Sequence, residues 1–175
     1  FKVPDTGRKF GNLTLTYAAQ LHIAVVEVDK DTCHAKVLAY AAIDDCGNAI
    51  NPQIAAGQVH GATAHGLGAA LMESFNYDGD GNLLTSTYSD YCPITSMNMP
   101  DVQFGNIETP SPFSYNGAKG MGEGGAAPLH TISAALQDAL FSEGLIITES
   151  HHSPPAIFAR LTQPNRRSAV RVESK

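Results

Sequence analysis

The sequence is poor in the residues that build several common kinds of protein. It has no tryptophan and only three cysteines in 175 residues, Cys33, Cys46 and Cys92. Three scattered cysteines exclude a disulfide scaffold, a zinc knuckle and an iron–sulfur cluster held by this chain alone. No apolar run approaches the ~20 residues that a membrane-spanning helix needs. Basic residues are also few, and a net charge of −6 without a basic stripe argues against nucleic-acid binding.

Apolar residues, in contrast, are abundant. Hydrophobic residues make up 43% of the chain and charged residues 16%, which excludes an intrinsically disordered protein. The length suits one domain or part of a larger one. Residues 1–12 form a polar lead-in without a signal-peptide or transit-peptide pattern. We therefore expect a cytoplasmic chain that begins inside a larger architecture.

Hydrophobic periodicity and turn signals divide the rest of the chain into short elements. We expect, in order, a hairpin of strands 13–29 and 35–43, helix 53–74, strands 83–91 and 102–108, helix 127–141, strand 145–148 and helix 154–161. Residues 163–175 form a basic tail, and the paired histidines at 151–152 are expected in an exposed loop. The predicted fold class is α+β, with antiparallel hairpins and helices packed on them.

The helix predicted at 53–74 contains four glycines, at positions 57, 61, 66 and 68. Each glycine costs a helix interior about 1 kcal/mol relative to alanine. Their presence indicates that a ligand or a neighbouring backbone approaches closely, or that the helix packs tightly on a sheet. His60 and His65 lie five residues apart on this helix and do not form a metal-binding pair.

The most unusual segment is the glycine cluster at residues 116–125, directly before the helix predicted at 127–141. Glycines at the start of a helix let the backbone approach an anionic group. The cluster is not a Walker A loop, because Gly120 rather than Ser or Thr follows Lys119. Residues 120–125 match G-x-G-x-x-G, but the segment before them does not read as the strand that a dinucleotide fingerprint requires.

Glu123 is the one carboxylate inside this glycine cluster. A carboxylate surrounded by backbone and close to a substrate can act as a general base, with a pKa tuned by burial. The same carboxylate could instead only stabilise the N-terminus of the following helix. The residues alone leave both interpretations open.

Four segments in order resemble those of the molybdenum hydroxylases, the family of xanthine dehydrogenase, aldehyde oxidoreductase and aerobic carbon monoxide dehydrogenase. They are LHIAVVEVDKDT with KVLAYAAIDDCGNAINP, IAAGQVHGATAHGLGAALMES, YDGDGNLLTSTYSDYCPITSMNMPDV, and GAKGMGEGG. The resemblance covers most of residues 13–162 and corresponds to the C-terminal part of the molybdenum-binding subunit. It implies that residues 13–162 form one molybdopterin-binding module, part of a larger domain.

The resemblance also assigns roles to particular residues. Glu123 is implied as the general base that takes a proton from the hydroxyl on molybdenum. The residues implied to bind the cofactor are Gln58, Ala118, Lys119, Gly120, Met121 and Gly122, while no residue of this chain is implied as a metal ligand. The implied cofactor is molybdopterin with molybdenum, in its cytosine dinucleotide form. The family often has Gln where this chain has His65.

The implied enzyme is an oxidoreductase that hydroxylates an electron-poor carbon of a heterocycle or aldehyde, with oxygen from water. It would work only with the rest of the molybdenum subunit, an iron–sulfur subunit carrying [2Fe–2S] clusters and a flavin subunit carrying FAD, as a dimer of that hetero-oligomer. Two other functions stay open, a non-catalytic assembly or scaffold domain and a dinucleotide-binding module. The substrate is not predicted, because the residues that select it lie mostly outside this chain.

Overall fold

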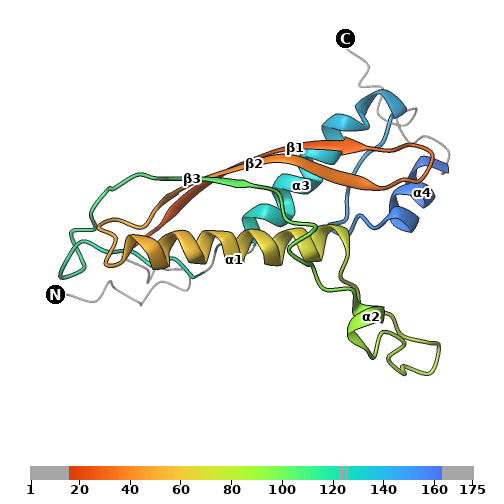
Figure 1. The fold of residues 1–175 in the computed structure, drawn as a ribbon, viewed down its shortest axis with the longest axis horizontal. Helices are drawn as coiled ribbons and strands as arrows, with labels where there is room; N and C mark the ends of the chain where they lie inside the picture. Colours follow the sequence, from red (N-terminus) through yellow and green to blue (C-terminus); the bar gives the residue numbers. More distant parts are fainter. Residues whose placement is uncertain (1–15, 123, 125, 163–175) are drawn as a thin grey trace, which may run out of the picture.

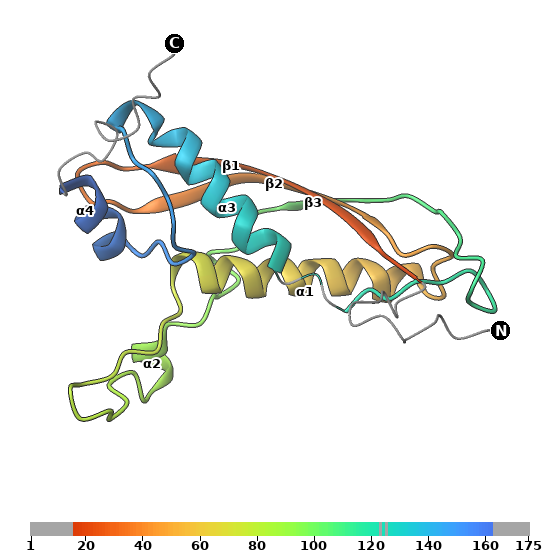
Figure 2. The same cartoon turned by 180° about the vertical axis from the view of Figure 1, so that it is seen from behind.

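The structure is a computed structural model that describes residues 16–122, 124 and 126–162 (Figure 1). For Ala126 it describes the backbone alone. A three-stranded sheet lies on one side, and helices α1 and α3 cover its inner face (Figure 2). The α+β class is confirmed. The expected lead-in 1–12 and basic tail 163–175 lie outside the described residues.

The predicted hairpin is confirmed, with β1 at Ala19–Val28 and β2 at Ala35–Asp45 paired antiparallel. Asp29 organises the turn, since its Oδ1 accepts from the N–H of Asp31 at 2.9 Å and of Thr32 at 3.2 Å. The register shifts after Val25, so Leu38 has no cross-strand partner and forms a bulge.

The third strand, β3 at Val102–Asn106, confirms the strand predicted at 102–108 but runs parallel to β2. The sheet order is therefore β1-β2-β3, with one antiparallel and one parallel pair. A parallel neighbour needs a long crossover, and α1 with the segment after it supplies this connection.

Helix α1 at Pro52–Leu71 confirms the predicted glycine-rich helix. The Asn51 side chain caps it by accepting from the N–H of Gln53 and Ile54, and proline occupies the first turn. Helix α3 at Ala126–Ala139 confirms the helix predicted at 127–141. The main core between these helices and the sheet consists of Tyr40, Ala42, Val59, Leu67, Ala70, Ile132 and Leu136.

Two predicted strands are wrong. Residues 72–101, between α1 and β3, form a projecting arm (Figure 1). In place of strand 83–91, this arm carries the short helix α2 at Tyr88–Tyr91, because Thr87 and Asp90 form a capping box. In place of strand 145–148, the chain is irregular because the Gln137 side chain occupies its backbone groups. Gln137 donates to the carbonyl of Leu145 and accepts from the N–H of Ile147 at 2.7 Å.

The chain ends its described part with a short 3₁₀ turn, η1 at Phe141–Glu143, and helix α4 at Pro154–Thr162. Helix α4 confirms the helix predicted at 154–161. Its Ile157 packs in a second apolar cluster with Cys33, Leu140 and Leu145, which ties the helix to the hairpin turn. None of the described helices is long and apolar enough to cross a bilayer.

Candidate cofactor site

The glycine-rich loop is fixed to the segment that follows β2. Residues 116–119 and 46–48 lie side by side, with an isolated antiparallel bridge between Gly47 and Ala118. The N–H of Lys119 donates to the carbonyl of Cys46 at 2.7 Å, and the N–H of Asn48 donates to the carbonyl of Gly117 at 3.4 Å. We call this pair of segments the clamp. It holds the loop at the end of the sheet where α1 begins.

Two glycines make the clamp possible. Gly47 has φ +65° and Gly117 has φ +77°. Both angles lie in the left-handed region of backbone conformation, which residues other than glycine rarely adopt. A Cβ at Gly47 would lie 2.1 Å from the Gly117 carbonyl oxygen, and one at Gly117 would lie 2.7 Å from the Pro110 Cβ. The two backbones therefore meet more closely than any side chain permits.

An ion pair closes the clamp. Lys119 Nζ lies 3.0 Å from Asp45 Oδ2, and both side chains are only 12% exposed. Burial acts to raise the pKa of Asp45, but hydrogen bonds from the Gly47 N–H, Lys119 and the Thr109 N–H lower it below its ordinary value. Lys119 therefore neutralises a carboxylate of this chain, and its ammonium is already paired.

A cavity of about 240 Å³ lies between the clamp and the first turns of α1. Gln58, Ala118, Lys119 and Met121, four of the six predicted cofactor-binding residues, line it together. Gly120 and Gly122 belong to the same loop and are exposed, but they do not line the cavity. The other lining residues are Cys46, Asn48, Ala49, Ile50, Asn51, Ile54 and Ala55. The structure thus joins the helix and loop residues that the sequence placed 60 positions apart.

Some backbone N–H groups of this loop donate hydrogen bonds within the chain, and others have no acceptor among the described residues. The N–H of Ala118 donates to Asn116 Oδ1 at 3.1 Å, and that of Lys119 is used in the clamp. Within the described ranges, no group accepts from the N–H of Gly120, Met121 or Gly122. These three donors are the ones that remain for an anionic ligand.

Glu123 lies outside the described residues, but its neighbour Gly124 is buried. A Cβ on Gly124 would lie 3.1 Å from the Ala62 Cβ and 3.1 Å from Gln20 Nε2. Gly124 thus occupies a narrow space between α1 and the side chain of Gln20 on β1. The backbone just after Glu123 has little freedom to shift.

The glycines of α1 do not all have the same environment. A Cβ on Gly57 or Gly61 would meet nothing within 4 Å, whereas one on Gly68 would lie 2.2 Å from Glu73 Oε1. At Gly68 the close neighbour is therefore the end of the Glu73 side chain, and not the backbone or ligand that the sequence predicted. Gly57 and Gly61 leave an exposed helix surface beside Gln58 and His65, which are also exposed.

The sequence predicted the paired histidines at 151–152 in an exposed loop. They lie in a loop, but neither of them is exposed. His152 is 1% exposed, and its Nε2 lies 2.7 Å from Ser133 Oγ. Arg160 Nη1 lies 2.9 Å from His152 Nδ1, so the neutral ring accepts from the guanidinium and donates to the hydroxyl. Burial, aided by the charge of Arg160, lowers the pKa of His152 to about 4. No local sequence pattern indicates this contact, because both partners are distant in sequence.

Sequence reasoning also missed Asp44, a buried carboxyl on β2 that is only 2% exposed. Asp44 directly precedes Asp45 and lies beside the clamp, in the last part of β2, which extends two residues beyond the strand predicted at 35–43. In the described part of the chain, no group of three His, Cys, Asp or Glu side chains gathers to hold a metal ion.

In this α+β fold, a glycine-rich helix and a glycine-rich loop share one cavity, an arrangement that suits a cofactor-binding domain. Residues 2–100 match the molybdopterin cofactor-binding domain family, and the chain belongs to that family. The resemblance to the molybdenum hydroxylases is confirmed by curated and solved relatives.

Among curated proteins, the chain is 35% identical over 153 residues to the carbon monoxide dehydrogenase large chain of Hydrogenophaga pseudoflava, covering 86% of this chain and 19% of that one. It is 38% identical over 138 residues to the nicotine 6-hydroxylase large subunit of Paenarthrobacter nicotinovorans, covering 78% and 17%. The quinoline 2-oxidoreductase of Pseudomonas putida 86 superposes with a TM-score of 0.78 at 38% identity, over 81% of this chain and 18% of that one. The chain thus spans about a fifth of the length of these relatives.

Proposed function

We propose that this chain forms the C-terminal, cofactor-binding part of the molybdenum-binding subunit of a molybdenum hydroxylase. The observation that carries the proposal is the cavity shared by Gln58 on α1 and Ala118, Lys119 and Met121 on the loop. Family membership supports molybdopterin with molybdenum as the occupant. We propose the cytosine dinucleotide form of this cofactor.

When bound, this cofactor supplies a Lewis-acidic metal and an activated oxygen for the oxidation of carbon. The residues of this chain hold it and position the base. In this proposal Gln58 and Met121 contact the cofactor in the cavity, and the N–H groups of residues 120–122, which have no acceptor among the described residues, are available to its anionic groups at the edge of the cavity. Lys119 keeps the loop in place through Asp45. Glu123 is the general base, and its carboxylate takes the proton released during attack on the substrate.

The reaction we propose is hydroxylation of an electron-poor carbon of a heterocycle or aldehyde, with water as the oxygen source. The relatives include a nicotine 6-hydroxylase and a quinoline 2-oxidoreductase, whose names support a heterocycle as the substrate. Electrons would pass to [2Fe–2S] clusters and FAD on partner chains. We propose that the whole enzyme is a cytoplasmic dimer of the hetero-oligomer.

Residues 13–162 make up the module in this proposal, with 1–12 as a lead-in and 163–175 as a tail. The dinucleotide-binding alternative loses support, because in the described ranges the residues between β3 and the G-x-G-x-x-G match contain no strand. The scaffold alternative does not explain why residues of α1 and of the glycine-rich loop share one cavity.

The substitution Glu123→Gln tests the proposal in the complete, assembled enzyme. Gln keeps the size and hydrogen bonding of the side chain but cannot accept the proton, so molybdenum content should persist while turnover falls. The loss should be at least the ~10²-fold that a general base contributes. Single-turnover reduction of the metal centre by substrate, at matched molybdenum occupancy, measures it.

The matched control is Glu108→Gln, which changes an exposed glutamate between β3 and the loop in the same way. This control should reduce the metal centre at the wild-type rate. If Glu123→Gln stays within about tenfold of wild type, Glu123 is not the base, and its role is only to stabilise the start of α3.

A further inference from the structure

Asp44 is the most costly unpaired group among the described residues. Its side chain points from β2 into the protein and is 2% exposed, yet neither carboxyl oxygen has a hydrogen-bond partner. Burial raises the pKa of Asp44, and the nearby amide of Gln20 only partly offsets this effect. A buried carboxyl without partners weakens a fold, so its presence calls for a role other than stability.

Among the residues that the structure describes, no charged group on the surrounding elements compensates Asp44. Lys119 is already paired with Asp45, and on the inner face of the sheet His22 Nδ1 lies 2.9 Å from the Tyr40 hydroxyl. Burial lowers the pKa of His22 and raises that of Tyr40 to about 12, so both are neutral. The titratable residues of α1 and of the described part of α3 are His60, His65, His130 and Asp138, all exposed.

Gln20 connects Asp44 to the glycine-rich loop. Gln20 lies directly opposite Asp44 in the β1–β2 register. The end of its side chain reaches Gly124, where Nε2 and Oε1 lie 3.1 and 3.5 Å from the position of a Cβ. On its other side Gly124 is confined by Ala62 of α1. The Gln20 side chain therefore forms one wall of the space that Gly124 occupies.

We propose that Asp44 and Gln20 are positioning residues for the cofactor loop, in which electrostatic attraction between the buried carboxyl and the amide of Gln20, opposite it in the register, keeps that side chain as the wall against Gly124. This inference rests on the proposed function, because it assigns the pair to the site where that cofactor binds. Neither residue touches the metal, so the expected effect of changing them is on how firmly the loop retains the cofactor.

The proposal and a merely structural role predict opposite effects of Asp44→Leu. Replacing an unpaired buried carboxyl with an apolar side chain of similar size leaves a fold unchanged or stabilises it. If Asp44 holds Gln20, the same change should loosen the loop and release molybdenum although the hairpin stays intact. Asp44→Asn keeps the hydrogen-bonding shape and should restore retention.

The experiment uses the assembled enzyme with its complete molybdenum subunit. The variants are Asp44→Leu, Asp44→Asn, Gln20→Ala and the double change of Asp44→Leu with Gln20→Ala, and the control is Asp31→Leu in the exposed hairpin turn. Two quantities are measured, the rate of molybdenum loss and the hydrogen-exchange protection of residues 117–122 relative to 19–28. Gln20 is exposed, so Gln20→Ala keeps the test valid should Asp44→Leu fail to assemble.

We expect Asp44→Leu and Gln20→Ala each to speed molybdenum loss by about 10- to 100-fold. The double variant should be no worse than either single one, since both changes remove the same wall. Protection should fall in 117–122 and persist in 19–28. Wild-type retention in Asp44→Leu or in Gln20→Ala, or additive effects in the double variant, would overturn the proposal. A wild-type enzyme that never contains molybdenum would instead overturn the proposed function.

Discussion

At the scale of single residues, His152 links three parts of the protein. Its backbone N–H donates to the Ala70 carbonyl at the end of α1, and its ring contacts Ser133 on α3 and Arg160 on α4. Arg160 also forms an ion pair with Glu149 at 2.9 Å. The neutral form of the ring is built into this arrangement, because protonation would place a second cation beside Arg160.

Acid should therefore loosen helix α4. The folded pKa of His152, about 4, lies below its ordinary value of 6.5, so the unfolded state binds more protons between these values. The stability that the neutral ring provides, about 3 kcal/mol at most, is complete above pH ~6.5 and lost as the pH falls through ~4. We expect the hydrogen-exchange protection factors of residues 154–162 to drop over this range in the assembled enzyme.

Two variants make this prediction specific. His152→Gln cannot be protonated and should show a flatter pH dependence over the same range. His65→Gln, which changes an exposed histidine on α1, should behave as wild type. An equal fall in protection in His152→Gln and in wild type would assign the effect to another group.

At the scale of elements, the exposed glycines of α1 distinguish this helix from an ordinary amphipathic one. Its buried side carries Ala55, Val59, Thr63, Leu67 and Ala70, as the core requires. On the open side, Gly57 and Gly61 lower helix propensity, and a Cβ at either would meet nothing within 4 Å among the described residues. We therefore expect this surface of α1 to be contacted by a cofactor or a partner chain.

Gly61→Val tests this conclusion. Valine has a higher helix propensity than glycine and meets open space, so the fold of this chain should not suffer. In the assembled enzyme we expect the added bulk to reduce molybdenum content or subunit assembly, with a strain of about 1–3 kcal/mol. Metal analysis and size-exclusion chromatography measure the two outcomes.

The control for Gly61→Val is His60→Val, which adds no bulk at the adjacent exposed position. It should leave assembly and metal content unchanged. Normal assembly and molybdenum content in Gly61→Val would mean that nothing approaches this surface of α1.

Local patterns predicted some elements and not others for physical reasons. The hairpin, α1 and α3 follow from short-range periodicity and caps, such as Asn51 before α1. The strands predicted at 83–91 and 145–148 fail because single side chains take over their backbone groups. Asp90 caps a helix in the first, and Gln137, from a different element, occupies the second.

The candidate site shows the same division. Gln58 and the loop residues at 118–122 were predicted through resemblance, because spacing alone does not reveal that positions far apart in sequence share a cavity. The sequence did not predict that Asp44 and His152 are buried, because the burial of a polar side chain depends on which other elements pack around it. For His152 these partners are Ser133 and Arg160.

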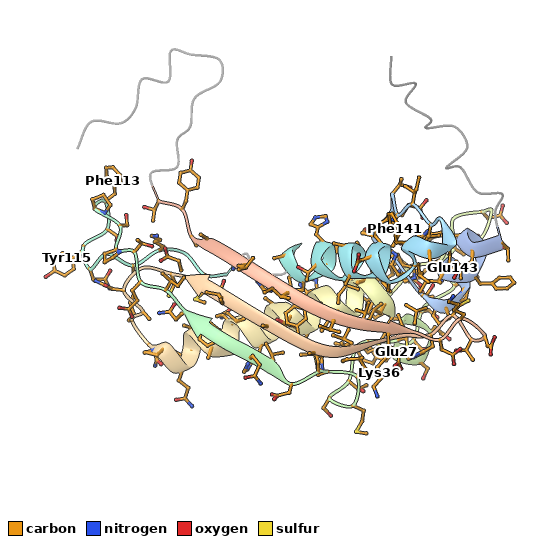
Figure 3. All side chains as sticks on the ribbon, turned by 90° about the horizontal axis from the view of Figure 1, so that it is seen from above. Glu27, Lys36, Phe113, Tyr115, Phe141 and Glu143 are labelled. Atoms are coloured by element: carbon orange, nitrogen blue, oxygen red, sulfur yellow. The ribbon has the colours of Figure 1, made fainter. Side chains whose placement is uncertain are left out.

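At the scale of the whole molecule, the outer face of the sheet is apolar, and none of the described helices covers it. Leu21, Ile23, Val25 and Leu38 are each 51–55% exposed. Figure 3 shows this face from above, with Glu27 and Lys36 at the hairpin-turn end and Phe113 and Tyr115 at the opposite end. An exposed apolar surface of this kind marks an interface, and the chain spans only about a fifth of its relatives.

We expect the chain expressed alone to self-associate through this face. The double substitution Ile23→Lys with Leu38→Lys should make the isolated chain more soluble, because charge on the face disfavours apolar association. The same change in the complete subunit should impair assembly. Light scattering after size-exclusion chromatography measures both effects.

Thr32→Lys, which adds the same charge in the exposed hairpin turn, is the control and should change neither property. If the unmodified isolated chain is monodisperse and well folded, the face does not need a covering partner. In that case the double substitution should have no effect on assembly.

The clamp also bears on the order of events during biosynthesis. Asp45 and Lys119 are separated by 74 positions, and α1, the arm and β3 are all translated between them. Closing so long a loop costs entropy that only the intervening elements repay once they have folded. We therefore expect the clamp, which forms one side of the cavity, to close late, after the chain has left the ribosome. The cofactor would then enter a domain that is already folded.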